Sequence, residues 1–203
     1  MRAALLALAA VLALAGCGSS KPESAAPPGT STVQGGLLGL RPETLPRKPH
    51  LVLTDTSGRR YSLAAATRGK LTYLYFGYTH CPDACPLTMS TIAAAIRDQP
   101  ASVRKRIAVV FVTVDPKRDT GPVLRRWLDG YNRSFVGLRG GGGAVDAAEA
   151  AAGVPRAPGG VLNHSTLVLA YSPDGLSHVV YSQGFSARDY AHDMPLLLRY
   201  GSG

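Results

Sequence analysis

Runs of apolar residues separated by polar turns predict strands and helices in alternation through most of the chain. Residues 71–76 are apolar and aromatic throughout, which predicts a strand buried on both faces. Apolar residues then recur at helical spacing until Pro100, which is expected to end a helix. A β-branched run at 107–114 predicts a second covered strand, and a helix is expected over about residues 122–129.

Hairpins are expected on both sides of this central region. The further expected elements are strands at 51–54 and 60–63 with Gly58 in their turn, a helix at 144–152, strands at 165–170 and 178–182 joined by a turn at 172–175, and a last helix at 187–199. This order of elements is typical of a thioredoxin-like α/β fold. We therefore expect a central mixed β-sheet flanked by helices, with an N-terminal β-hairpin.

The first residues have the features of a signal peptide. One basic residue, Arg2, precedes an unbroken apolar stretch that is shorter than the roughly 20 residues of a membrane-spanning helix. The sequence Leu14-Ala15-Gly16-Cys17 resembles the lipobox of bacterial lipoproteins, so residues 1–16 are expected to be removed and Cys17 to carry lipid. Residues 17–44, rich in Gly, Ser and Pro, are expected to form a flexible linker to a domain at residues 45–203.

The formal net charge of +9 could attract the protein to an anionic membrane surface or an acidic protein patch, but the positive charges are scattered along the chain, which favours an ordinary solvated surface. Nucleic acid is not expected, because the chain has an export signal and no basic run interleaved with aromatic residues. The four glycines at 140–143 are interpreted as a loop, since no Lys-Ser/Thr pair follows them as in a phosphate-binding loop.

Three cysteines are present, and an odd number in an exported protein needs an explanation. If Cys17 carries lipid, Cys81 and Cys85 remain as one pair in the turn between the first covered strand and its helix. The positive end of the helix dipole is expected to favour their thiolate forms. Such a pair can form a disulfide, stay as a dithiol or bind a metal. Asp115 follows the neighbouring strand, and functional groups gather at such strand ends.

Three segments together resemble the Sco/SenC family. They are Tyr78-Thr79-His80-Cys81-Pro82-Asp83-Ala84-Cys85-Pro86, then Asp115-Pro116-Lys117-Arg118-Asp119-Thr120, then Asn163-His164-Ser165. The resemblance implies a thioredoxin fold at the outer face of the bacterial cytoplasmic membrane. It also implies copper as Cu(I) or Cu(II), bound by Cys81, Cys85 and His164, with Asp115 beside the ligands.

The resemblance also implies a function as a copper chaperone that assists assembly of the binuclear copper centre of cytochrome c oxidase. The implied partners are the copper-binding subunit of that oxidase and a second copper chaperone as donor. Two soft sulfur ligands and one imidazole suit copper, and Cu(I) accepts three ligands. Asn163 stands where the family often has Asp, which removes a carboxylate next to His164.

The alternative function is that of a thiol–disulfide oxidoreductase that keeps the oxidase's copper-binding cysteines reduced. Thioredoxins have two residues between their cysteines, whereas this chain has three, which favours metal binding over dithiol exchange. A thiol peroxidase is disfavoured, because Tyr78 stands where peroxiredoxins have Thr. Among the other histidines, His80 is interpreted as a neighbour of the site. His50, His178 and His192 are given structural roles.

Overall fold

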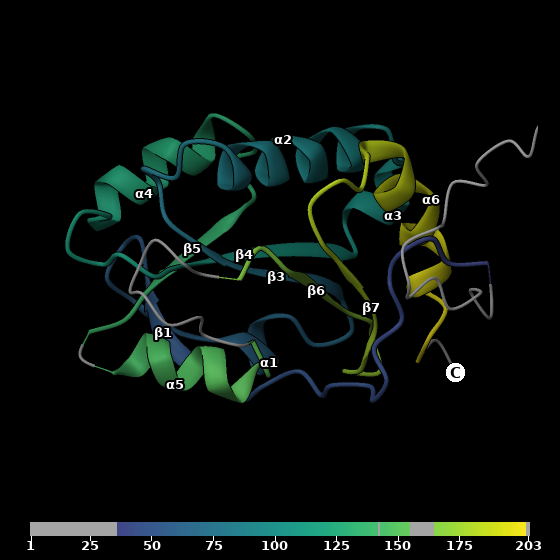
Figure 1. Ribbon diagram of the computed structural model, residues 1–203, viewed down its shortest axis with the longest axis horizontal. Coiled ribbons are helices and arrows are strands. Elements are labelled where there is room, and N and C mark those ends of the chain that lie inside the picture. Colours follow the sequence, from purple (N-terminus) through teal and green to yellow (C-terminus); the bar gives the residue numbers. More distant parts are fainter. Residues whose placement is uncertain (1–35, 142, 155–164, 202–203) are drawn as a thin grey trace, which may run out of the picture. The chain divides into compact units, whose positions relative to one another are not determined.

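The computed structural model describes residues 36–141, 143–154 and 165–201, which contain a seven-stranded mixed β-sheet between helices (Figure 1). The strands are β1 (Val52–Asp55), β2 (Arg60–Ser62), β3 (Leu71–Gly77), β4 (Ile107–Thr113), β5 (Val136–Arg139), β6 (Val168–Tyr171) and β7 (Ser177–Tyr181). The helices are α1 (Leu63–Ala66), α2 (Ala84–Arg97), α3 (Ala101–Arg104), α4 (Gly121–Asp129), α5 (Ala144–Ala151) and α6 (Ala187–Leu197). The order across the sheet is β2-β1-β5-β4-β3-β6-β7.

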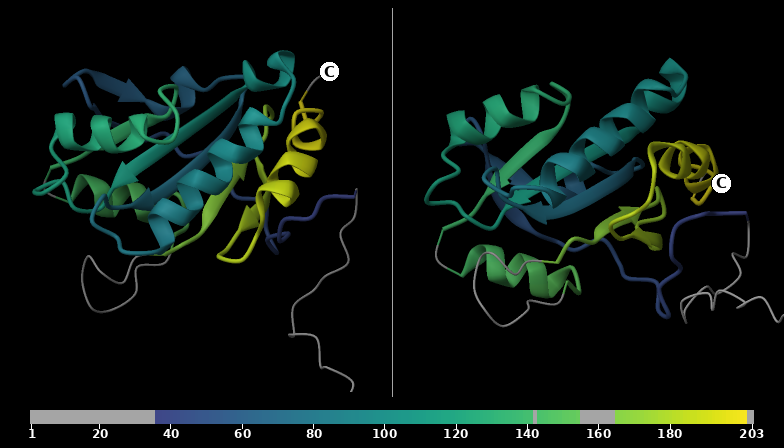
Figure 2. Two further views of the ribbon diagram at one scale, coloured as in Figure 1. Left: turned by 90° about the horizontal axis from the view of Figure 1, so that it is seen from above. Right: turned by 45° about the horizontal axis from the view of Figure 1, so that its top comes forward.

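The expected thioredoxin-like arrangement is confirmed. The three central strands β5, β4 and β3 are parallel, while the β1–β2 and β6–β7 hairpins add antiparallel strands at the two sides. Helices α2 and α4 cover one face of the sheet and α5 lies against the other (Figure 1), with α6 beside α2 in both views of Figure 2. Every residue of β3 is buried, as expected for a strand with helices on both sides.

The register of the two central strands determines where the chemistry is placed. Gly77, the last residue of β3, lies opposite Thr113, the last residue of β4. Because parallel strands end at the same edge of a sheet, the segments that follow these two residues are neighbours. The cysteine segment follows β3, and the Asp115 segment follows β4.

The structure adds elements that the sequence pattern did not predict. Strand β5 was not expected, because its four residues include Gly137 and end in Arg139 and so carry little strand signal. A Cβ atom at Gly137 would lie 2.8 Å from side-chain atoms of Leu124 and Leu128, so glycine lets α4 pack closely on the strand. The one-turn helices α1 and α3 were also not expected.

Residues 37–40 contact the domain, although the linker was expected to continue to residue 44. Leu37 is buried, and the backbone N–H groups of Leu38 and Gly39 each donate to the carboxylate of Asp193 at 2.8 Å. That carboxylate is fully buried and also accepts from the Tyr181 hydroxyl at 2.8 Å, so it joins this segment to β7 and α6. Among the residues that the structure describes, no helix combines the length and the apolar character that crossing a membrane requires.

Candidate metal centre

Cys81 and Cys85 lie together where β3 leads into α2. Cys85 is in the first turn of the helix and has no solvent exposure, while Cys81 in the preceding turn is 8% exposed. The backbone N–H of Cys85 donates to the Cys81 sulfur at 3.3 Å, and neither cysteine is in a disulfide. The helix start therefore brings the two thiol groups to one point.

The sulfur of Cys85 occupies a closely packed space between β3 and the helix. A Cβ atom at Gly77 would lie only 2.8 Å from this sulfur and 2.8 Å from the ring of Tyr75, so no larger residue fits at position 77 without a shift. The Tyr75 hydroxyl donates to the Cys85 sulfur at 3.6 Å. This sulfur therefore has a polar neighbour but no access to bulk water.

Burial raises the pKa of the Cys85 thiol to about 12. The hydrogen bond from Tyr75 acts in the opposite direction but is the smaller effect. For Cys85, the expectation that the helix end favours the thiolate is therefore wrong. The loss of hydration outweighs the helix dipole, whose effect at a terminus is modest. A metal that binds this sulfur must displace its proton.

Asp119 holds the cysteine segment against the end of β4. Its carboxylate is fully buried and accepts from the Thr79 backbone N–H at 3.0 Å and the Thr79 hydroxyl at 2.5 Å. The Thr113 hydroxyl, at the end of β4, donates to the same carboxylate at 2.5 Å. Thr79 is two residues before Cys81, so this network positions the loop that carries the first sulfur.

Asp115 makes its contacts within its own loop, residues 115–120, and with Thr113 at the end of β4. Its carboxylate forms an ion pair with Arg118, and its backbone N–H donates to the Thr113 hydroxyl at 3.0 Å. The backbone C=O of Asp115 accepts from the Asp119 N–H at 2.9 Å, which closes the turn that directs Asp119 inward. Asp115 is thus near the expected site, while the carboxylate that contacts the cysteine loop is that of Asp119.

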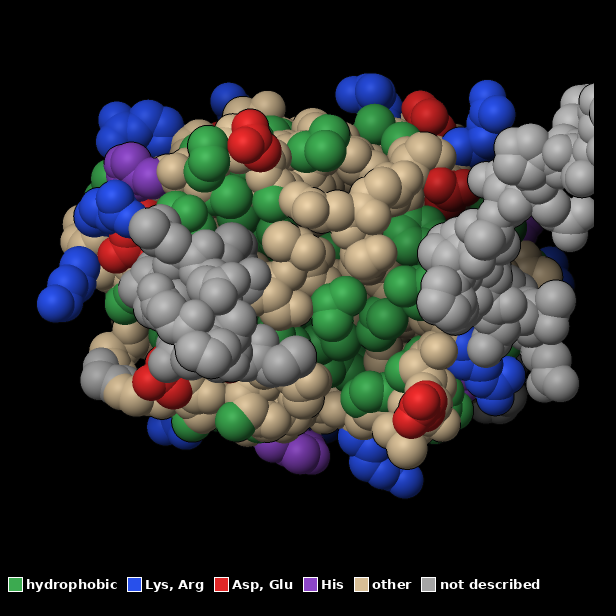
Figure 3. Space-filling model, viewed as in Figure 1, with side chains coloured by type: hydrophobic (Ala, Val, Ile, Leu, Met, Phe, Trp, Pro, Cys, Tyr) green, Lys and Arg blue, Asp and Glu red, His purple; other side chains and the backbone are tan. Residues whose placement is uncertain are grey.

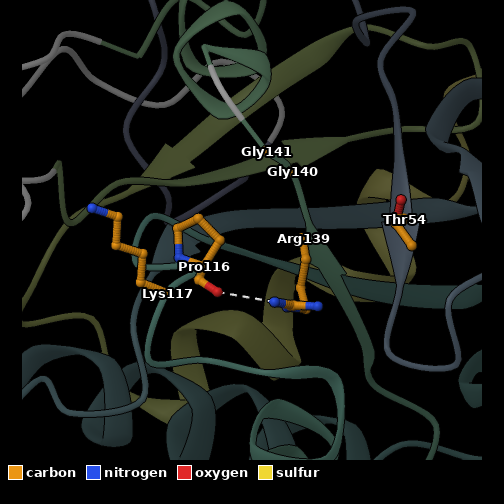
Figure 4. A pocket seen from close by; sticks show the side chains of 6 residues that line it. All are labelled: Thr54, Pro116, Lys117, Arg139, Gly140 and Gly141. Atoms are coloured by element: carbon orange, nitrogen blue, oxygen red, sulfur yellow. Dashed lines mark hydrogen bonds between the residues drawn. The ribbon is translucent and has the colours of Figure 1, made fainter.

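Arg139, at the end of β5, braces the same loop from the other side. Its guanidinium donates to the backbone oxygen of Asp119 at 2.6 Å. It also donates to the backbone oxygen of Pro116 at 2.9 Å (Figure 4). Arg139, Pro116 and Lys117 are among the residues that line a pocket of about 450 Å³. The loop is therefore fixed by contacts from β3, β4 and β5.

The third expected ligand, His164, lies outside the described residues, as does Cys17. His80 is 54% exposed, with its Nδ1 atom 3.0 Å from the Thr79 hydroxyl and 3.8 Å from Asp119. Within the described ranges, no three His, Cys, Asp or Glu side chains are grouped as a metal site would require. The ligand set of Cys81, Cys85 and His164 stays a prediction.

The other histidines lie away from the cysteines. His178 pairs with Asp174 at 2.7 Å and stacks on Tyr200, and His192 lies 2.9 Å from Asp193. His50 lines a separate pocket near Arg68.

Sequence reasoning did not single out Asp119, Tyr75 or Gly77. The aromatic run and its terminal glycine were the signal for the last two, but the pattern does not show which ring faces a sulfur. Asp119 was part of the segment that carries the resemblance. The signal that Asp119 accepts hydrogen bonds was a pair of threonines, Thr79 shortly after β3 and Thr113 at the end of β4. Their hydroxyl groups can donate to a buried carboxylate.

The SCO1/SenC family model matches residues 42–199. The chain belongs to the SCO1/SenC family. It is 33% identical over 140 residues to a provisionally named copper-binding protein of Stutzerimonas stutzeri, covering 64% of this chain and 68% of that protein. It is 32% identical over 143 residues to the mitochondrial SCO2 homolog of Bos taurus, covering 66% of this chain and only 53% of that protein.

A solved family structure confirms the fold. The copper-bound structure of Bradyrhizobium japonicum ScoI superposes with a TM-score of 0.63 at 24% identity, over 74% of this chain and 98% of that one. The match to the family model includes both cysteines, the Asp119 loop and position 164.

The two cysteines are expected to differ in reactivity. At pH 8, a thiol with a pKa of about 12 is thiolate in only about one molecule in ten thousand, and the thiolate is the nucleophile. Iodoacetamide should therefore modify Cys81 first in the reduced, metal-free protein, as read by peptide mass spectrometry. The rate at Cys85 should keep rising about tenfold per pH unit beyond pH 9. Equal rates at both cysteines in the folded protein, as in a urea-unfolded control, would contradict this difference.

Replacing Asp119 with Ala should loosen the cysteine loop. The change leaves the buried hydroxyl of Thr113 and the N–H of Thr79 without their acceptor, which we expect to cost about 2–4 kcal/mol of unfolding free energy. Alkylation of Cys81 should be severalfold faster than in the unaltered protein. Asp83→Ala is the matched control, because it removes an exposed carboxylate from the same loop. Equal stability and alkylation rates in the two variants would show that Asp119 does not hold the loop.

Proposed function

We propose that this protein binds copper through Cys81, Cys85 and His164. The observation that carries the proposal is the proximity of two cysteines that are not in a disulfide, with the Cys85 N–H on the Cys81 sulfur and the fully buried Cys85 sulfur against the Tyr75 hydroxyl. Two sulfur donors are the ligands that Cu(I) prefers, and an added imidazole would also suit Cu(II). The copper-binding and copper-bound relatives support the choice of metal.

Copper binding at the two sulfurs is coupled to proton release. Both thiols must lose their protons when copper binds, so binding releases protons and weakens as the pH falls. The Tyr75 hydroxyl would donate to the Cys85 sulfur and hold its orientation. The Asp119 network would keep Cys81 in place, so that little ordering remains for the moment of binding.

Copper is the cargo in this proposal. The protein would assist assembly of the binuclear copper centre of cytochrome c oxidase by transferring copper to the oxidase's copper-binding subunit, after loading from a second copper chaperone. A lipid on Cys17 would hold the domain at the outer face of the bacterial cytoplasmic membrane, within reach of that subunit. The family membership and the export-type N-terminus support this role.

The alternative remains a thiol–disulfide oxidoreductase that reduces the oxidase's cysteines before copper is loaded. The two neighbouring cysteines, neither of them in a disulfide, favour it, but the raised pKa of Cys85 leaves only Cys81 as the attacking thiol. Both functions need the two cysteines. His164 separates them, because imidazole completes a copper site and is not required for thiol exchange.

His164→Ala should therefore fail to support oxidase assembly while its cysteine pair still cycles between dithiol and disulfide. The variant should retain Cu(I) on its two sulfurs but lose the thiolate-to-Cu(II) charge-transfer band, because Cu(II) also needs nitrogen. Oxidase activity in copper-limited cells and the absorption spectrum of the loaded protein measure these effects.

The matched control is His50→Ala, which removes an exposed imidazole distant from the cysteines and should behave as the unaltered protein. If His164→Ala restores full oxidase activity in copper-limited cells, copper transfer through this site is wrong and the reductase function takes its place.

A further inference from the structure

The end of the sheet opposite the cysteines is built from five segments of the chain. Strands β3 and β4 begin there, α2 and α6 end there, and the β6–β7 turn reaches the same end because β6 is antiparallel to β3. Hydrogen bonds join these segments. Leu71 N–H donates to the backbone oxygen of Arg106, Arg106 donates to that of Leu198, and Lys48 N–H to that of Gly175.

This end, here called the basic end, carries the net charge of the described domain. Its charged residues are Arg47, Lys48, Arg68, Lys70, Arg97, Arg104, Lys105, Arg106 and Arg199, with Asp98 and Asp174 as the acids. The described residues include 19 of the chain's 22 Lys and Arg and 12 of its 13 Asp and Glu, a net charge of +7. Nine cations and two acids give the basic end +7 by itself, and the other ten cations and ten acids cancel.

Most of the cations at the basic end face solvent. The exposed ones are Arg47, Arg68, Arg97, Arg104, Lys105, Arg106 and Arg199. Figure 3 shows Lys and Arg side chains around the rim of the face that it draws, at both ends of the molecule, and a largely uncharged centre. Asp174, one of the two acids, lies 2.7 Å from His178. By contrast, three acids elsewhere lie in ion pairs with arginines, at Asp55, Asp115 and Asp129.

A hollow of about 280 Å³ lies within the basic end. Arg47, Lys48 and Arg68 line it together with Asp174. The Lys48 ammonium donates to neutral oxygens of Thr67 and Thr72, and burial lowers its pKa to about 8. An incoming anion would stabilise this partly desolvated charge.

We propose that the basic end lies against anionic phospholipid headgroups, so that the cysteine end points away from the membrane toward its protein partner. The proposal rests on the membrane location given under the proposed function. A membrane surface fits because the cations come from several separate segments of the chain, from Arg47 to Arg199. A site for one acidic peptide would instead concentrate them along a single groove.

The segment between Cys17 and the domain does not determine which end of the domain faces the membrane. Eighteen residues lie between Cys17 and Gly36, so the extended chain could span about 60 Å and allow either end to reach the bilayer. A lipid on Cys17 would keep the domain at high effective concentration beside the surface. Weak attraction by several cations is then enough to orient it, and the attraction should fall with rising ionic strength.

Lysine acetylation on vesicles tests the orientation. The full-length mature protein is bound to vesicles of phosphatidylcholine alone, or of phosphatidylcholine with about 30% phosphatidylglycerol, which makes the surface anionic. Lys70 and Lys105 report on the basic end, and the exposed Lys117 in the Asp115 loop is the internal control. On the anionic vesicles, Lys70 and Lys105 should react at least about threefold more slowly, and Lys117 should be unchanged.

Charge reversal provides matched variants. Arg68→Glu, Arg97→Glu and Arg199→Glu together should remove the protection, while Arg60→Glu, Arg126→Glu and Arg188→Glu make the same charge change elsewhere and should retain it. Protection that persists in the first triple variant, or equal reactivity of Lys70, Lys105 and Lys117 on the anionic vesicles, would overturn the proposal. So would protection that appears only in native membranes containing protein, which would indicate an acidic protein partner.

Failure of this inference can be told from failure of the proposed function. Flotation with neutral vesicles reports the lipid on Cys17. A protein without lipid should still float with the anionic vesicles at low salt, because the basic end alone attracts them, and its lysines can then be read in the same way. Copper binding should be unchanged in both triple variants, since their substituted residues are outside the cysteine site.

Discussion

The buried carboxylate of Asp119 is the constraint on which the arrangement of the site depends. It accepts hydrogen bonds from Thr79 in the cysteine segment and from Thr113 at the end of β4, while its own backbone oxygen is held by Arg139 of β5. Three neighbouring parallel strands are thus tied together at their C-terminal edge. A buried charge is stable only when its partners surround it, so the network holds the cysteine loop in one position.

Much of the fold could be predicted from the sequence, because β3, α2 and β4 have long and regular apolar patterns. Strand β5 could not, since its four residues form a strand by pairing with the free edge of β4 and not through their own propensity. Cys81 was placed correctly in the turn before α2, whereas Cys85 lies in the first turn of the helix, which begins at Ala84. The raised pKa of Cys85 was missed, because the packing of Tyr75 and Gly77 around its sulfur depends on the tertiary structure.

The sequence also does not show which of two carboxylates in one loop faces the cysteines. Asp115 and Asp119 are four residues apart, and either could have faced the cysteines. The turn closed by the Asp119 N–H and the Asp115 carbonyl directs Asp119 inward and leaves Asp115 to pair with Arg118. The charges of the described residues cancel outside the basic end, so the net positive charge lies opposite the cysteines. This division suits a protein that binds a metal at one end and meets a charged surface with the other.

X-ray absorption at the copper edge of the Cu(I)-loaded protein tests the central claim most directly, because it counts the ligand atoms. Two cysteine sulfurs and one imidazole predict two sulfur scatterers and one nitrogen scatterer per copper. In His164→Ala, only the nitrogen should be lost. A first shell of three or four sulfurs, or one that His164→Ala leaves unchanged, would contradict a site formed by Cys81, Cys85 and His164.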